Sequence, residues 1–338
     1  MLQKLKTTFV YTFLATCLVL SLALAGIYSY TTLHLTQPIS LTEKILIHIK
    51  PGQNLRQFVD LLAEQSLIDY PLVWYAYLKL FAQNFTLKYG EYHMQPNMHL
   101  AELLRKINKA EVVYYKFTLL EGTNLRQTLL ALSQANLIHR LEGNYQTKIA
   151  QLQDFLKLKN PEGWFFADTY YYHRYMEDLV LLKTAHQKMQ RVLAKVWIKR
   201  KPKLPLDTPY KALILASIIE KESALPDERK IIAGVFINRL NKSMRLQSDP
   251  TVIYGLGKKF TGNLTRADLR QPTAYNTYRI AGLPPTPIAA VGQEALWAAV
   301  QPEQTSAFYF VSRGDGSHYF SATLREHNAA VRRYQLKR

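Results

Sequence analysis

The pattern of apolar and polar residues begins with one long apolar run and continues as shorter amphipathic segments. Phe9–Tyr30 is uncharged and long enough to cross a bilayer. Two lysines precede it, and no Lys or Arg follows before Lys44. We therefore predict a cytoplasmic tail over 1–8, a retained anchor over 9–30 and an exported remainder. Ala23–Ala25 resembles a signal-peptidase site, so a cleaved signal peptide is the alternative.

Two segments 70 residues apart share the run Gly-x-Asn-Leu-Arg-Gln, one within Pro51–Ile68 and the other within Glu121–Ile138. Each is expected to be a strand, a glycine turn and an amphipathic helix, with strands over Ile45–Ile49 and Val112–Leu119. In both copies the Asn and the Gln three residues later have the spacing of a capping box. A further strand over Leu87–Met94 and a short helix capped by Asn97 follow the first copy. Residues 45–116 are thus predicted to form a small α+β module.

The second half is organised around Leu213–Glu222. A proline after Thr208 signals the start of a helix, and from Ala212 to Ile219 only Ser217 is polar. A helix that is apolar nearly all round lies inside a domain. A carboxyl group at the end of such a run keeps its proton more readily than one in water, which suits a general acid. The periodicity does not choose between Glu220 and Glu222, and a plain solvated helix end is the alternative.

Further segments of the second half also have predictable forms. Amphipathic patterns predict helices over Glu177–Arg200 and Asp227–Asn241, and Arg245–Gly255 is expected to be a polar turn leading into an apolar run. A hairpin is expected around Gly314–Gly316, followed by a final helix capped by Thr323. The aromatic segment Pro161–Tyr172 contains a carboxylate, which suits either a carbohydrate groove or the packing of an irregular loop.

Composition narrows the class of partner. The chain has 338 residues and a formal net charge of +18, which favours an anionic partner such as nucleic acid, anionic lipid or an acidic polymer. Zinc-type Cys/His spacing and RNA-binding aromatic signatures do not occur in the sequence, so we expect no metal, no cofactor and no nucleic-acid partner. The single cysteine, Cys17, falls in the apolar run, so the exported part has no disulfide.

Five motifs together resemble the endolytic murein transglycosylase, or YceG-like, family. They are Ala216–Glu222, Val235–Leu240, Arg245–Gly255, Tyr275–Tyr278 and Gly282–Pro285. The resemblance implies an α+β fold with an N-terminal transmembrane helix, a LysM-like module over 45–116 and a mixed α+β catalytic domain over 117–338. It also implies a lyase that cleaves the MurNAc–GlcNAc bond within nascent glycan strands, and it places the catalytic glutamate on Glu220.

A lytic transglycosylase needs only one carboxyl group of raised pKa, which first protonates the glycosidic oxygen. The same group then takes the proton of the muramic acid 6-hydroxyl, which closes a 1,6-anhydro ring. The residues expected to bind substrate are Gln247, Asp249, Tyr275, Asn276 and Tyr278. Glu220 and Glu222 are two residues apart on a helix and cannot face each other across a sugar. A water-using muramidase, with Asp249 as its second carboxylate, is one alternative, and a non-catalytic glycan-binding scaffold is the other.

The resemblance also implies a place in the cell. We expect a single-pass protein of the cytoplasmic (inner) membrane, with its catalytic domain outside the cytoplasm. Its expected partners are peptidoglycan glycan strands and peptidoglycan synthases (penicillin-binding proteins), in cell-wall assembly and glycan chain termination.

Overall fold

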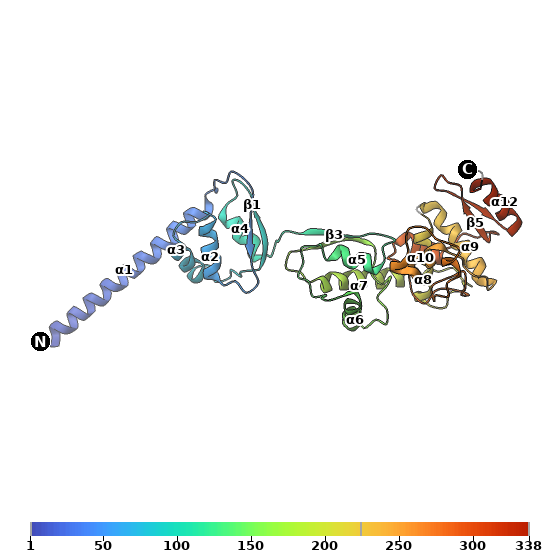
Figure 1. Ribbon diagram of the computed structural model, residues 1–338. Coiled ribbons are helices and arrows are strands. Elements are labelled where there is room, and N and C mark those ends of the chain that lie inside the picture. Colours follow the sequence, from blue (N-terminus) through green and yellow to red (C-terminus); the bar gives the residue numbers. More distant parts are fainter. Residues whose placement is uncertain (1, 224, 337–338) are drawn as a thin grey trace. The chain divides into compact units, whose positions relative to one another are not determined.

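The computed structural model describes residues 2–223 and 225–336 (Figure 1). The chain divides into two compact units, and each is described by itself. The first comprises Met1–Tyr115 with His173–Tyr175, and the second comprises Lys116–Tyr172 with Met176–Arg338.

The first unit begins with α1 (Leu2–Thr36), whose segment Lys4–Thr36 is the one described helix long and apolar enough to cross a membrane. The predicted span 9–30 lies within it. Its threonines need no partner outside the helix, because hydroxyls such as that of Thr16 donate to the carbonyl four residues earlier. The helix is therefore compatible with a single-pass anchor.

The rest of the first unit packs helices against a two-stranded sheet. Its elements are β1 (Ile45–Ile49), α2 (Leu55–Glu64), α3 (Pro71–Leu80), β2 (Gly90–Met94) and α4 (Leu100–Asn108). The two strands are antiparallel, with Ile45 opposite Met94 and Ile49 opposite Gly90. Buried residues such as Phe58 and Trp74 fill the space between helices and sheet.

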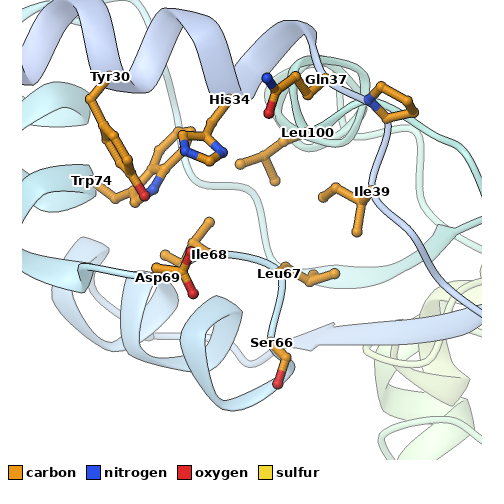
Figure 2. Close-up of a pocket in the computed structure, with 11 residues that line it drawn as sticks. Tyr30, His34, Gln37, Ile39, Ser66, Leu67, Ile68, Asp69, Trp74 and Leu100 are labelled. Atoms are coloured by element: carbon orange, nitrogen blue, oxygen red, sulfur yellow. The ribbon is translucent and has the colours of Figure 1, made fainter.

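The end of α1 packs against this module rather than standing free of it. A cavity of about 160 Å³ lies there, where Tyr30 and His34 of α1 face Trp74, Ile68 and Leu100 (Figure 2). The rings of Tyr30 and Tyr70 meet edge to face, with their centroids 5.7 Å apart. Aromatic contacts of this kind attach the apolar helix to the folded part of the first unit.

The second unit has short strand pairs at its edges and buried helices at its centre. Its elements are β3 (Tyr115–Leu119), α5 (Leu125–Leu132), α6 (Tyr145–Leu156), β4 (Asp168–Tyr172), α7 (Asp178–Ile198), α8 (Pro209–Glu222), α9 (Arg229–Asn241), α10 (Asp249–Leu256), α11 (Gln293–Val300), β5 (Tyr309–Ser312), β6 (His318–Ser321) and α12 (Leu324–Tyr334). Strand β3 pairs with β4, and β5 pairs with β6 in an antiparallel hairpin.

The core of the second unit surrounds α8. Residues 212–220 of this helix are all buried, and α11 lies against it along a face rich in alanine. Small side chains let α8 and α11 approach closely. Helices α7, α9 and α10 also contact α8, which is therefore held on several sides. The end of α8 is therefore a rigid place from which to present a side chain.

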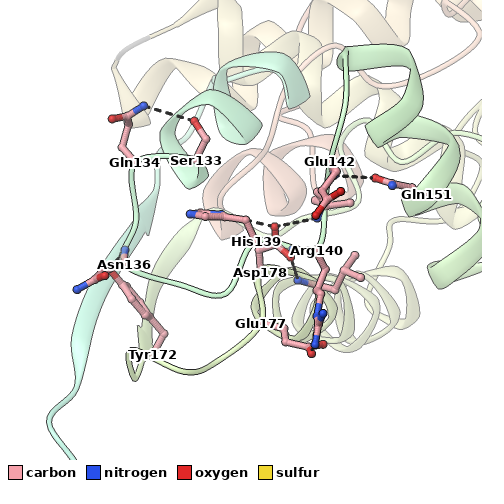
Figure 3. Close-up of polar contacts among 12 residues, drawn as sticks. Ser133, Gln134, Asn136, His139, Arg140, Glu142, Gln151, Tyr172, Glu177 and Asp178 are labelled. Atoms are coloured by element: carbon pink, nitrogen blue, oxygen red, sulfur yellow. Dashed lines mark hydrogen bonds and ion pairs between the residues drawn. The ribbon is translucent and has the colours of Figure 1, made fainter. Parts of the chain in front are cut away.

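Hydrogen bonds and an ion pair hold the part of the second unit that precedes α7. The buried carboxylate of Asp178 accepts the backbone N–H groups of Arg140 and Leu141 at 3.0 and 3.2 Å (Figure 3). The Arg140 guanidinium also pairs with Glu177 at 2.8 Å. An acidic side chain in the first turn of a helix is stabilised by the helix dipole. These bonds attach the loop between α5 and α6 to the start of α7.

Several expectations for the local structure are confirmed. Both capping boxes form, Asn54 with Gln57 and Asn124 with Gln127. The glycines before them take positive φ angles of 79° and 75° at Gly52 and Gly122. The capping box of Thr323 and the hairpin before it are also present.

Other expectations are corrected. The strand predicted over Val112–Leu119 begins only at Tyr115. The cap of α4 is His99, because Asn97 takes a left-handed turn with φ of 63° instead. The segment expected to be a polar turn is irregular only as far as Ser248, and the run after it forms α10, since Pro250 falls in the first turn, where a missing N–H costs nothing.

Candidate active site

Local contacts at its start and in its interior fix the position of helix α8. The Thr208 hydroxyl accepts the N–H of Lys211 at 3.2 Å, and Pro209 occupies the first turn. Inside the helix the Ser217 hydroxyl donates to the Ile214 carbonyl and accepts the N–H of Ile288, so the one polar residue of the buried run is satisfied. The two glutamates at the end of α8 are thereby held in position.

Glu220 lies in a buried ion pair. Its Oε1 accepts Nη2 of Arg229 at 2.6 Å, and its Oε2 accepts the N–H of Gly292 at 3.0 Å. Its side chain is 2% exposed. Burial raises the pKa of Glu220, while the Gly292 N–H and Arg229 oppose that shift and Glu121 adds to it. Glu220 thus ties the starts of α9 and α11 to the end of α8.

Glu222 has different surroundings. Its carboxyl group accepts a short hydrogen bond from the Ser248 hydroxyl and lines a cavity of about 510 Å³. Burial raises the pKa of Glu222 to about 7, and the charge of Asp249 acts in the same direction, while Ser248 and Arg239 oppose it. This carboxyl group therefore keeps its proton to a higher pH than a carboxyl group in water does.

Three of the residues expected to bind substrate line the cavity of Glu222, namely Gln247, Asp249 and Tyr278. The Tyr278 hydroxyl donates to Oδ1 of Asp249 at 2.7 Å. The backbone of Gln247 takes a positive φ of 51° and bonds through its N–H to Thr277. Tyr278 is thus brought to one cavity with Asp249, 29 positions earlier in the chain.

Arg239 forms part of the wall of this cavity. Its guanidinium donates to the carbonyls of Phe308 at 2.6 Å and Leu246 at 2.7 Å. These bonds connect α9 to the segment that carries Gln247 and to the residue that precedes strand β5. Arg239 thus makes structural contacts while it also lines the cavity.

The other two expected binding residues lie elsewhere. Asn276 is fully buried, and its amide donates to the carbonyls of Gln271 at 2.7 Å and Leu269 at 3.1 Å. The hydroxyl of Tyr275 bonds Thr286 at 2.8 Å, and its ring packs on Tyr254 with centroids 4.8 Å apart. In this structure both residues hold the loop that presents Tyr278, and neither lines the cavity of Glu222.

The sequence alone assigned Ser248 no role, since its partner Glu222 lies 26 residues away in the chain. The helix periodicity also left Glu220 and Glu222 equivalent, and only the family resemblance placed the catalytic role on Glu220. The ion pair with Arg229, nine residues along the chain, separates them. Only the packing of α9 against α8 creates that difference.

Comparison with known proteins gives consistent results. A family described as "YceG-like family" matches residues 47–333. An endolytic murein transglycosylase of Bacillus subtilis (strain 168) is 28% identical over 324 residues, covering 89% of this chain and 88% of the relative. One from Streptococcus pneumoniae serotype 2 is 27% identical, covering 85% of this chain but 58% of that longer protein. A crystal structure of a YceG-like protein from Listeria monocytogenes matches with a TM-score of 0.53 and 29% identity, covering 86% of this chain and 99% of that one.

Proposed function

Because this chain belongs to the YceG-like family, we propose that it is an endolytic lytic transglycosylase of peptidoglycan. The observation that carries this proposal is the carboxyl group of Glu222. It lies in a cavity with Gln247, Asp249 and Tyr278, and its pKa is raised to about 7 by burial. A carboxyl group of that pKa serves as both acid and base near neutral pH.

The proposed reaction uses one group twice. Glu222 donates its proton to the oxygen of the MurNAc–GlcNAc bond as the bond to C1 of muramic acid breaks. The carboxylate then takes the proton of the muramic acid 6-hydroxyl, whose oxygen attacks C1. The products are a free GlcNAc 4-hydroxyl and a 1,6-anhydro-MurNAc end, and no water is consumed. The neighbouring charge of Asp249 would stabilise the positive charge that develops at C1.

We propose Glu222 as the acid in place of Glu220, the residue that the family resemblance implies. The Glu220 carboxylate accepts hydrogen bonds from Arg229 and Gly292. Protonation of Glu220 would break its ion pair with Arg229. Glu222 accepts only a hydroxyl among the described residues and faces the cavity. Glu220→Gln remains the matched comparison, because it was the expected catalytic residue.

The decisive experiment digests uncrosslinked glycan strands with the purified protein and identifies the ends by mass. Glu222→Gln is expected to lower turnover by at least about a thousandfold with the protein still folded. Glu220→Gln is expected to keep turnover within about tenfold if it is equally soluble. Loss of turnover in Glu220→Gln alone would return the role to Glu220.

Product chemistry separates the rival functions. Anhydro ends, lighter by one water than ordinary reducing ends, are expected. Ordinary reducing ends would instead identify a muramidase with Asp249 as its second carboxylate, and intact strands would favour a non-catalytic glycan-binding scaffold.

The remaining expectations complete the proposal. The order β1, α2, α3, β2 with antiparallel pairing supports a LysM-like, glycan-binding module over 45–116, before a catalytic domain over 117–338. The basic residues before the apolar run support a cytoplasmic N-terminus in the inner membrane and a catalytic domain outside the cytoplasm. Action on nascent strands beside peptidoglycan synthases, in wall assembly and chain termination, would follow from that location. Reporter fusions at each end of the chain test the orientation.

A further inference from the structure

A second cavity of the second unit shares no lining residue with the cavity of Glu222. It has a volume of about 550 Å³ and lies between the end of α8, the start of α5 and the helix α10. Lys221 and Pro250 line this cavity, while their chain neighbours Glu222 and Asp249 line the other one. Both cavities therefore border the end of α8 and the start of α10, where consecutive residues line different cavities.

The second cavity is strongly basic. Arg126, Lys221 and Lys258 line it, and none of them forms an ion pair with a carboxylate of the described chain. Arg126 is fixed in place, since its guanidinium lies 3.8 Å from the centroid of the Tyr145 ring. Three cations at one cavity without counter-charges repel one another, and an anionic ligand would remove that repulsion.

The one acidic residue of this lining does not neutralise the cations. Glu162 is 3% exposed, and its carboxyl group accepts the N–H of Leu125 at 2.9 Å and the Tyr254 hydroxyl at 2.9 Å. Burial raises the pKa of Glu162 to about 7, and the bond from Tyr254 opposes the shift. Glu162 is thus satisfied within the wall.

The remaining surface of the cavity is apolar. Ile253, Phe260 and Ile288 line it beside the cations. A neutral sugar would gain little from three positive charges, because sugar recognition uses amide, hydroxyl and carboxylate groups. The combination fits a ligand that carries carboxylates on a backbone with small aliphatic side chains. A short acidic peptide has that chemistry.

We propose that this cavity binds the acidic peptide carried by the muramic acid residues of murein, with its carboxylates on Lys221, Lys258 and Arg126. The inference rests on the proposed function, since the glycan of the same strand would occupy the cavity of Glu222. The peptide and the glycan then bind on two sides of the end of α8. Strands that carry peptides are bound more tightly than bare strands.

The test uses the full chain in detergent and two double variants of equal charge. Lys221→Met/Lys258→Met removes two cations of the cavity and keeps their apolar stems. Lys242→Met/Lys259→Met removes two exposed lysines that line neither cavity. The substrates are glycan strands with their peptides and the same strands stripped by an amidase.

The preference for peptide-bearing strands, expressed as a ratio of kcat/KM values, is expected to fall at least about tenfold in Lys221→Met/Lys258→Met, through KM. It is expected to stay within about twofold in the control pair. Equal preference in the two double variants, or wild-type protein without preference for peptides, overturns the proposal.

A second measurement does not depend on catalysis. The peptide released from murein by an amidase is titrated into Glu222→Gln, and binding that weakens with added salt and with the two cavity substitutions is expected. No binding overturns this inference and leaves the proposed reaction intact. Peptide binding, together with wild-type protein that cleaves no strands, supports the site and refutes the proposed reaction instead.

Discussion

Glu220 and Glu222 are separated by one residue at the end of α8, yet their carboxyl groups have opposite surroundings. Glu220 is paired with Arg229 at 2.6 Å in the interior. Glu222 accepts the Ser248 hydroxyl and faces a cavity. Residues two apart on a helix point about 200° apart, so one helix end supplies both a structural ion pair and a candidate acid.

Removal of Arg229 should expose the structural role of Glu220. In Arg229→Met the carboxyl group of Glu220 stays buried without its partner, and the free energy of unfolding is expected to fall by about 3–5 kcal/mol. Glu220→Gln/Arg229→Met should recover most of that loss, because neither charge remains. Chemical denaturation followed by tryptophan fluorescence measures both. A double variant no more stable than Arg229→Met would show that Arg229 acts through other contacts.

The pH profile of cleavage should follow Glu222. Its pKa is raised to about 7, and the reaction begins from the protonated acid, so kcat/KM is expected to fall about tenfold per pH unit above that value. The bond from Ser248 stabilises the ionised form. Ser248→Ala should therefore move the falling limb to higher pH. An unmoved limb would mean that another group controls it.

Glu162 should make stability depend on pH. Its pKa is raised from 4.5 to about 7, so between these values the folded chain keeps a proton that the unfolded chain releases. The contribution of Glu162 to stability is then fully present below about pH 4.5 and is lost as pH rises to about 7, by up to ~3 kcal/mol. Denaturation at several pH values should show that the free energy of unfolding falls less steeply with pH in Glu162→Gln than in the wild type. The exposed Glu142→Gln is the matched control, and an equal slope in both variants would contradict the assignment.

Asn276 should matter through the loop rather than through contact with substrate. Its amide donates to the carbonyls of Gln271 and Leu269, so Asn276→Ala leaves buried acceptors unpaired and is expected to cost about 2–3 kcal/mol. Limited proteolysis should cut the loop near Tyr278 faster, and KM should rise. Tyr275→Phe, which loses a single hydroxyl bond, is the milder comparison, at about 1 kcal/mol. A stable Asn276→Ala with raised KM would favour direct binding instead.

The sequence by itself determined the elements whose signals are local. The capping boxes at Asn54 and Asn124 and the proline start of α8 depend on residues three or fewer apart, so they form where the pattern places them. The burial of α8 also followed, because an apolar surface all round a helix needs cover on every side.

Only the tertiary structure decided which glutamate faces a cavity. The ion pair of Glu220 needs Arg229, and the hydrogen bond of Glu222 needs Ser248, 26 residues away. Asn276 was likewise expected to bind substrate. Its carbonyl partners come from a loop whose path the sequence does not reveal, so its structural role could not be predicted. The pKa of a carboxyl group depends on such distant neighbours and on burial, and no local pattern of residues contains either.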